Sequence, residues 1–222
     1  MSTYENLIND GKYQEVIDEL TPILANNSYN AEALTWYAKA QFKLNQFDLA
    51  IDSYNRLINL FPINADLYAD RGLCYHLAGE AKFAIVDFNK AVELEPENAY
   101  RYSCRAFVKD YYKDYQGALE DYNKAIEIDP KDAITHNNKG VLEEKLGFAE
   151  QAQESFVNSN KIQGIDLDKE LAKINTSDLP PITLPEPIKQ KLSLKGYFNV
   201  VKSIFSTRKG ITEFLRFLKM KK

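Results

Sequence analysis

The sequence has 222 residues, of which 45% are hydrophobic and 27% are charged, a balance typical of a folded chain and not of a disordered one. No stretch approaches the ~20 consecutive apolar residues that a membrane-spanning helix needs. The first residues, MSTYENLINDGKYQE, lack the basic start and the apolar run of a secretory signal. Two cysteines, Cys74 and Cys104, fit a reducing compartment better than a disulfide framework, so we expect a cytoplasmic protein.

From its N-terminus to about residue 166 the chain repeats a pattern every 34 residues, marked by Pro62, Pro96 and Pro130. A period of this length predicts stacked pairs of helices, because one unit cannot bury its apolar face alone. Residues near 1–30 carry a degenerate first copy, and the full copies are 31–64, 65–98, 99–132 and 133–166.

Within the full copies, the residue types at fixed positions predict how the two helices pack. A small residue at position 8 and Ala at position 20 allow close approach of the helices, and an aromatic residue at position 24 fills the space between pairs. Asn or Asp at the end of each copy is expected to cap the next helix, and the Pro two residues before it to stop the preceding one. The residues are, in order, Ala38, Gly72, Ala106 and Gly140; Ala50, Ala84, Ala118 and Ala152; Tyr54, Phe88, Tyr122 and Phe156; and the caps Asn30, Asn64, Asn98 and Asp132.

In these positions the chain resembles the tetratricopeptide repeat (TPR) family, as the segments RGLCYHLAGEAKFAIVDFNKAVELEPEN and KGVLEEKLGFAEQAQESF illustrate. The resemblance covers residues 1–166. It implies an all-α, right-handed superhelix of about five helix-turn-helix repeats. With a capping helix at 167–174, the array would span 1–174. An array of this kind is a surface that holds other molecules and by itself does no chemistry, so the resemblance implies a non-catalytic scaffold or adaptor that binds a protein or peptide.

Two features depart from the family pattern. Lys113 replaces the usual Gly of the inter-helix turn, so we expect that turn to be reshaped and the neighbouring Tyr111 and Tyr112 to be partly exposed. Position 7 holds Arg where position 23 holds Asp, which predicts an ion pair between the two helices of one repeat. The alternative is that these arginines bind a ligand. The last full copy has Lys139 at position 7 and Ser155 at position 23, and it does not follow this Arg–Asp pattern. The pairs are Arg71 with Asp87 and Arg105 with Asp121.

The resemblance also implies a binding surface, because in the family the first helix of each repeat lines a concave groove. Members that hold the C-terminal carboxylate of chaperone tails use Lys, Asn and Arg at positions 2 and 6. Here Glu32, Asp66 and Asp70 would repel a carboxylate, which argues against chaperone tails and favours a basic, partly apolar partner. The expected groove residues are Glu32, Trp36, Lys39, Asp66, Asp70, Leu73, Tyr100, Cys104, Phe107, Asn137, Asn138 and Val141.

The C-terminal part differs in composition from the repeats. Residues 175–187 are a Pro-rich spacer, and 188–222 are expected to form a basic, amphipathic helical tail. Residues 189–222 hold ten Lys or Arg and one acid, a balance of +9, whereas the rest of the chain holds 18 basic and 31 acidic residues, a balance of −13. The tail is expected to make its contacts through Phe198, Val201, Ile204, Phe205, Phe214, Leu215 and Leu218.

Three surfaces, or an unidentified partner protein, could bury this apolar stripe. Docking on the acidic repeats of the same chain is favoured by charge and by tethering. The alternative is an anionic membrane surface, which would make the protein a peripheral membrane-attached adaptor. Nucleic acid is disfavoured, because the body is acidic and no nucleic-acid-binding motif accompanies the basic run.

The sequence contains no pattern that predicts catalysis. There is no nucleophile–base pair, no glycine-rich phosphate loop and no cluster of metal ligands, and the two histidines, His76 and His136, lie at different repeat positions. We therefore expect no enzyme activity, no cofactor and no metal ion.

Overall fold

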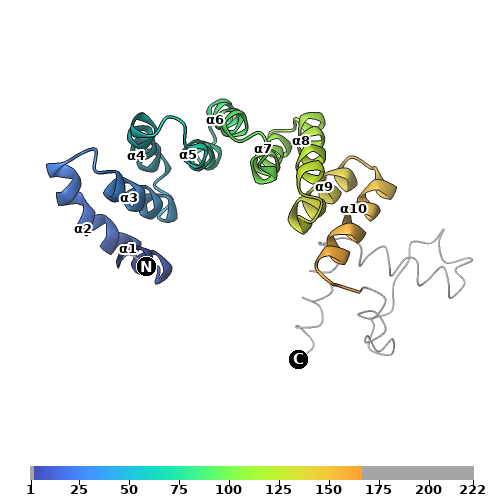
Figure 1. Cartoon of the computed structure of the whole chain (residues 1–222), viewed down its shortest axis with the longest axis horizontal. Coiled ribbons are helices and arrows are strands. Elements are labelled where there is room, and N and C mark those ends of the chain that lie inside the picture. The colour runs from blue at the N-terminus through green and yellow to red at the C-terminus, as the bar shows by residue number, and fades with distance from the viewer. Residues whose placement is uncertain (1–2, 167–222) are drawn as a thin grey trace, which may run out of the picture. The chain divides into compact units, whose positions relative to one another are not determined.

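The computed structural model describes residues 3–166, and in this range the chain forms ten α-helices and no strand (Figure 1). The all-α prediction is therefore confirmed for these residues. The predicted capping helix at 167–174, the spacer and the tail, with all of its contact residues, lie outside the described range. The helices are α1 (Thr3–Asn9), α2 (Tyr13–Asn26), α3 (Ala31–Lys43), α4 (Phe47–Leu60), α5 (Ala65–Leu77), α6 (Ala81–Leu94), α7 (Ala99–Tyr111), α8 (Tyr115–Ile128), α9 (Ala133–Lys145) and α10 (Ala149–Ile162).

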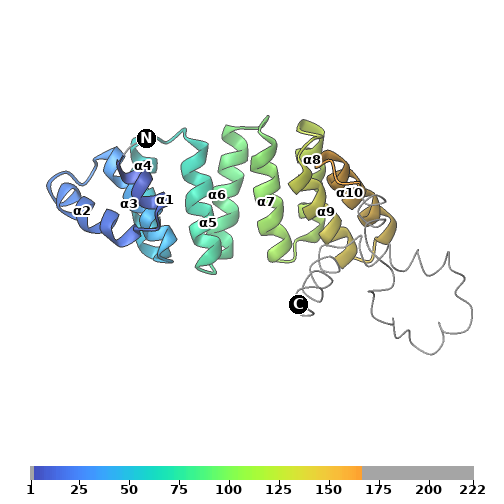
Figure 2. The same cartoon turned by 90° about the horizontal axis from the view of Figure 1, so that it is seen from below.

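The chain divides into two compact units, residues 1–130 and 131–222. In the first unit, consecutive helices form antiparallel hairpins that stack on one another, so that α4 packs on α5 and α6 on α7. The odd-numbered helices also contact each other, α1 with α3 and α5 with α7. In Figure 1, α3, α5 and α7 accordingly form one row and α4 and α6 another, and Figure 2 shows α5, α6 and α7 side by side.

The helix ends follow the predicted capping pattern. Asn30, Asn64 and Asn98 each accept a hydrogen bond from a backbone N–H in the first turn of the next helix, and Asp132 accepts two. Helices α4, α6 and α8 end two residues before Pro62, Pro96 and Pro130. Both predictions are confirmed, and the reason is local: each signal acts on backbone groups within a few residues of itself.

The small and aromatic positions of the repeat form the core of the hairpins. Ala50, Ala84 and Ala118 are fully buried, and the aromatic side chains four residues after each of them are buried as well. At Gly72 an added Cβ would lie 3.2 Å from the ring of Phe88. The close approach of the helices that the sequence predicted from the small residue at position 8 is therefore present, and the aromatic residue at position 24 packs on it within the same hairpin.

The turn between α7 and α8 is not reshaped, and the prediction made from Lys113 is wrong. Lys113 adopts φ of +68°, in the same left-handed region as Gly79 at +84°. The backbone hydrogen bonds also match, because Asp114 N–H donates to the Lys109 carbonyl at 2.9 Å as Glu80 N–H donates to that of Tyr75 at 2.8 Å. The exposure of the flanking tyrosines is confirmed: Tyr111 is exposed and Tyr112 is half-buried.

The second unit contains one described hairpin, α9 and α10. Its two helices approach closely, since a Cβ added to Gly140 would lie 2.8 Å from the Phe156 ring. Glu143, which is buried, accepts a hydrogen bond from Ser155 Oγ at 2.7 Å and forms an ion pair with Lys139 at 3.3 Å. Lys139 and Ser155 are thus not paired with each other; each binds Glu143 instead.

Candidate partner-binding face

The arginines at position 7 are bound within the repeats, as the sequence predicted. Arg71 donates from Nε and Nη2 to the two carboxylate oxygens of Asp87, at 2.8 and 2.6 Å. Arg105 makes the same paired bonds with Asp121, at 2.8 and 2.6 Å. Because both carboxylates are buried, these pairs hold the two helices of a repeat together.

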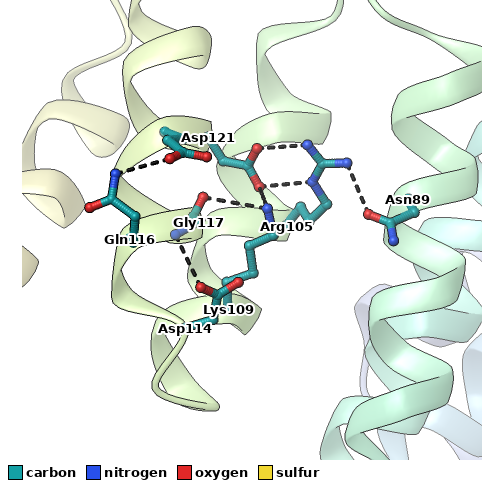
Figure 3. Close-up of polar contacts among 8 residues, drawn as sticks. Asn89, Arg105, Lys109, Asp114, Gln116, Gly117 and Asp121 are labelled. Carbon is teal, nitrogen blue, oxygen red and sulfur yellow. Dashed lines mark hydrogen bonds and ion pairs between the residues drawn. The ribbon is translucent and has the colours of Figure 1, made fainter.

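Each arginine also reaches the preceding hairpin. Arg71 Nη1 donates to Asn55 of α4 at 2.7 Å, and Arg105 Nη1 donates to Asn89 of α6 at 2.9 Å. Figure 3 shows Arg105 between Asn89 and Asp121, with Lys109 forming a second ion pair to Asp121 at 2.8 Å. Each arginine therefore links two successive hairpins. Because the guanidinium groups are engaged in these contacts, we do not assign the arginines to a ligand site.

Helices α3, α5 and α7 of the first unit lie in one row and present one face (Figure 1). On each helix, residues spaced by four, three and four positions lie along one side. We call this surface the α3–α5–α7 face, and it consists of Glu32, Trp36, Lys39 and Lys43; Asp66, Asp70, Leu73 and Leu77; and Tyr100, Cys104, Phe107 and Tyr111.

A cavity of about 200 Å³ opens on this face. Three predicted residues, Lys39, Asp70 and Leu73, line it together, although they come from two different helices. Four further residues that the sequence analysis did not assign to the groove complete the lining: Ile8 of α1, Phe42 and Lys43 of α3, and Tyr54 of α4.

Asp70 supplies the carboxyl group of the cavity, and its titration is perturbed. Burial raises its pKa above the ordinary range of a carboxyl group, and nearby Lys39 opposes this shift. The hydroxyl of Tyr54 donates a hydrogen bond to Asp70, and burial raises the Tyr54 pKa as well. A half-desolvated carboxylate in a cavity is a usual component of binding sites.

One acidic side chain of this face, Asp66, is already paired with a cation of the same chain, which the sequence did not predict. Arg101, which is buried, donates to Asp66 of α5 and also to Glu95, the latter at 2.8 Å. The side chain of Asp66 nevertheless stays mostly exposed. Glu32 is exposed in the first turn of α3. The repeat pattern contained no signal for Arg101, because position 3 has no shared residue type.

Aromatic side chains dominate the part of the face that α7 contributes. Tyr100, Phe107 and Tyr111 are 64%, 50% and 64% exposed. Tyr100 is hydrogen-bonded with half-buried Cys104, and this bond, with burial, raises the Tyr100 pKa to about 12. Beneath them lies buried His76, whose ring meets Tyr111 edge-on with centroids 4.7 Å apart.

His76 is also unusual in its hydrogen bonding. Its Nδ1 is buried and has no hydrogen-bond partner within the described chain. Burial lowers the pKa of this imidazole. The aromatic part of the face therefore covers a neutral, desolvated histidine and presents an apolar surface to the solvent.

The remaining predicted residues belong to the second unit. Asn137 and Asn138 of α9 are half-buried, and Val141 is exposed. They are described with their own hairpin, and the cavity is formed by the first unit alone.

Residues 3–166 contain no cluster of three or more His, Cys, Asp or Glu side chains arranged to hold a metal ion. None of the helices described in this range is both long and apolar enough to cross a bilayer.

Comparison with known families identifies repeats in three segments. A model described as "TPR repeat" matches residues 111–147, and models described as "Tetratricopeptide repeat" match 32–62 and 65–98. No curated protein is significantly similar in sequence.

Several solved structures have a similar fold. A crystal structure of MamA is 22% identical, with a TM-score of 0.65 over 78% of this chain and 99% of its own. YrrB, described as a TPR protein with an unusual peptide-binding site, is 19% identical, with a TM-score of 0.59 over 77% and 88%. A thermophilic TPR protein of Thermus thermophilus is 18% identical, with a TM-score of 0.59 over 76% and 92%. At these identities the likeness concerns the fold.

Proposed function

Since the chain belongs to the tetratricopeptide repeat family, whose members are protein–protein interaction modules, we propose that it is a non-catalytic cytoplasmic scaffold or adaptor. In this proposal it holds a segment of a partner protein against the α3–α5–α7 face, the part of the concave groove that the first unit supplies. The observation that carries the proposal is the combination on one face of a cavity with exposed aromatic side chains.

Exposed aromatic residues of this size are a physical reason for binding. Phe107 and Tyr111 leave much of their ring area in water, and burying such area contributes about 25 cal/mol per Å². Aromatic residues are also enriched at the centres of protein interfaces. Support by analogy comes from YrrB, which has a peptide-binding site on a similar fold.

We propose that the partner carries positive charge where it contacts one edge of the face. Glu32 and Asp66 both lie in the first turns of their helices, and both are exposed. Asp66 is already paired with Arg101, yet its exposed side chain can accept further hydrogen bonds. Basic residues of the partner are therefore placed along this edge, next to apolar ones that contact α7.

For the tail we propose docking on the acidic repeats of the same chain. The specific observation is the charge balance of +9 in residues 189–222 against −13 in the remainder. The 13-residue spacer, 175–187, spans roughly 40 Å at about 3.1 Å per residue when extended, enough to return along several helices. The competing role is that of a membrane-attached adaptor whose tail binds anionic lipid.

The test of the partner-binding face compares two exposed phenylalanines. Phe107 on α7 is 50% exposed and Phe83 on α6 is 56% exposed, but Phe83 is not part of the α3–α5–α7 face. Tagged full-length protein is used to retain partners from cell extract. We expect Phe107→Asp to lose proteins that wild type and Phe83→Asp both retain. Equal retention by the two variants would overturn the assignment of this face.

A further inference from the structure

The cavity on the α3–α5–α7 face is lined by residues from four helices. Ile8 of α1, Phe42 of α3 and Leu73 of α5 supply apolar walls, and Tyr54 of α4, itself buried, completes the lining. All of these helices belong to the first unit. The site is thus built by the packing of one compact unit.

The size of the cavity matches a side chain. Its volume of about 200 Å³ exceeds that of cavities of about 150 Å³, which in other proteins admit benzene when their walls are apolar. A leucine, methionine or phenylalanine side chain therefore fits, whereas a whole folded element does not. An apolar anchor in a pocket of this kind is where interface energy concentrates.

Two lysines give the cavity a local excess of positive charge. Lys39 and Lys43 are four residues apart on α3 and thus lie on the same side of the helix. Asp70 supplies one negative charge, but it lies near Lys39 and accepts the hydroxyl of Tyr54. A second acid, Asp66, also acts on Asp70, but it is paired with Arg101. The Lys39 ammonium is 4.8 Å from the centre of the Trp36 ring, and Lys43 is exposed in the last turn of α3.

We propose that this cavity is the anchor subsite of the partner-binding face, and that it takes a large apolar side chain with a carboxylate beside it. The apolar group fills the space between Ile8, Phe42 and Leu73, and the carboxylate meets Lys39 and Lys43. The inference rests on the proposed function for its partner. It adds that the face is polarised, with basic residues of the partner near Glu32 and Asp66 and an acidic group at the lysines.

The test uses small probes on the full-length protein. 3-Phenylpropionate, 3-phenylpropanamide and phenethylamine share a phenyl group on a two-carbon chain but carry a negative, a neutral and a positive group. Methyl NMR is used to follow Ile8 and Leu73 during titration with each. We expect the carboxylate to bind several-fold more tightly than the amide and the amine to bind most weakly, with differences that shrink as salt screens the charges.

Variants separate the two parts of the site. Lys43→Glu, at an exposed position, should reverse the order of the carboxylate and the amine. Leu73→Trp should fill the cavity and abolish binding of all three probes, whereas Val86→Trp, on α6 outside the α3–α5–α7 face and 62% exposed, should leave binding unchanged. Circular dichroism shows that each variant is folded; if Leu73→Trp is not, the Lys43→Glu reversal decides.

The proposal fails if no probe binds, if the amine binds as tightly as the carboxylate, or if Val86→Trp and Leu73→Trp act alike. This failure is distinct from that of the proposed function, which depends on whether partner retention requires Phe107. Two peptides then separate the sources of the carboxylate, one ending in a free C-terminal Phe and one with an internal Phe-Glu pair and an amidated end. If the first peptide binds more tightly, the carboxylate of the partner is its chain terminus. If the second binds more tightly, the carboxylate belongs to an acidic side chain.

Discussion

Arg71 and Arg105 each connect three helices through one guanidinium group. In the repeats without arginine at position 7, a different hydrogen bond joins the two helices. In the α3–α4 hairpin, Ser53 Oγ donates to Gln41 Oε1 at 2.8 Å. In α9–α10 the equivalent bond runs from Ser155 to Glu143. The partner of position 23 therefore sits at position 7 when that residue is Asp and at position 11 when it is Ser, because a shorter side chain needs a nearer partner.

The two ion pairs differ in a way that predicts unequal costs of truncation. In Arg71→Ala the carboxylate of Asp87, which is 2% exposed, loses its cation. In Arg105→Ala, Asp121 keeps Lys109 at 2.8 Å. Removing one partner of a buried pair costs about 3–5 kcal/mol, so we expect a loss of that order for Arg71→Ala and a clearly smaller one for Arg105→Ala. Urea unfolding followed by circular dichroism measures both.

A double variant provides the control for this comparison. Adding Lys109→Ala to Arg105→Ala removes the second cation, and the total loss should then exceed the sum of the two single losses. Equal costs for Arg71→Ala and Arg105→Ala, or strict additivity in the double variant, would contradict the role assigned to Lys109.

At the scale of the elements, the turn after α7 shows that neighbouring helices determine a backbone conformation. Lys113 takes the left-handed conformation that Gly79 and Gly147 take in the equivalent turns. A residue with a Cβ is disfavoured there by about 1–2 kcal/mol. The packing of α7 and α8 requires this geometry, so the strain is retained at Lys113.

Replacing Lys113 with Gly should therefore stabilise the protein. After the greater freedom of Gly in the unfolded chain is counted, we expect a net gain of about 0.5–1 kcal/mol and a melting temperature higher by roughly 1–4 °C. The matched control is Gly79→Ala, which should lower the melting temperature through backbone strain alone, because an added Cβ there meets no atom within 4 Å. A melting temperature unchanged or lowered in Lys113→Gly would count against strain in this turn.

At the scale of the whole molecule, the charge is partitioned between the repeats and the C-terminal segment. A tail with a balance of +9 carries apolar residues at helical spacing, and leaving each of these exposed forgoes roughly 1.5–3 kcal/mol. The sequence predicts short helices in the tail, and isolated helices shorter than about 12–15 residues are only marginally stable in water. The tail therefore gains from a surface, and the tethered acidic repeats are the nearest one.

Self-docking predicts amide protection in the tail without any added partner. Hydrogen exchange on the intact protein should be slow at Phe198, Ile204, Phe214 and Leu218, and deletion of residues 188–222 should lower the melting temperature. High salt should weaken both effects, because the attraction is partly electrostatic. Fast exchange that slows when anionic vesicles are added, with melting unchanged by the deletion, would instead support the membrane-attached adaptor.

Most of the fold was predictable from the sequence, because the signals that specify it are local and repeated. Prolines that stop helices, Asn and Asp caps, and small and aromatic residues at fixed positions each act within one hairpin. The Arg71–Asp87 and Arg105–Asp121 pairs were predictable for the same reason, since their separation recurs within a repeat.

The tertiary structure decided the features that depend on residues from different repeats. The cavity adds Ile8 of α1, Phe42 and Lys43 of α3, and Tyr54 of α4 to the groove residues that the sequence predicted. Arg101 reaches Asp66 in the preceding hairpin, and this contact changes the charge that the face presents. Periodicity specifies which side of a helix is buried, but the contacts between side chains of successive hairpins depend on how far each helix is rotated and shifted against the next. That rotation and shift result from packing across the whole unit, so the sequence by itself determined the repeats and the tertiary structure determined the site.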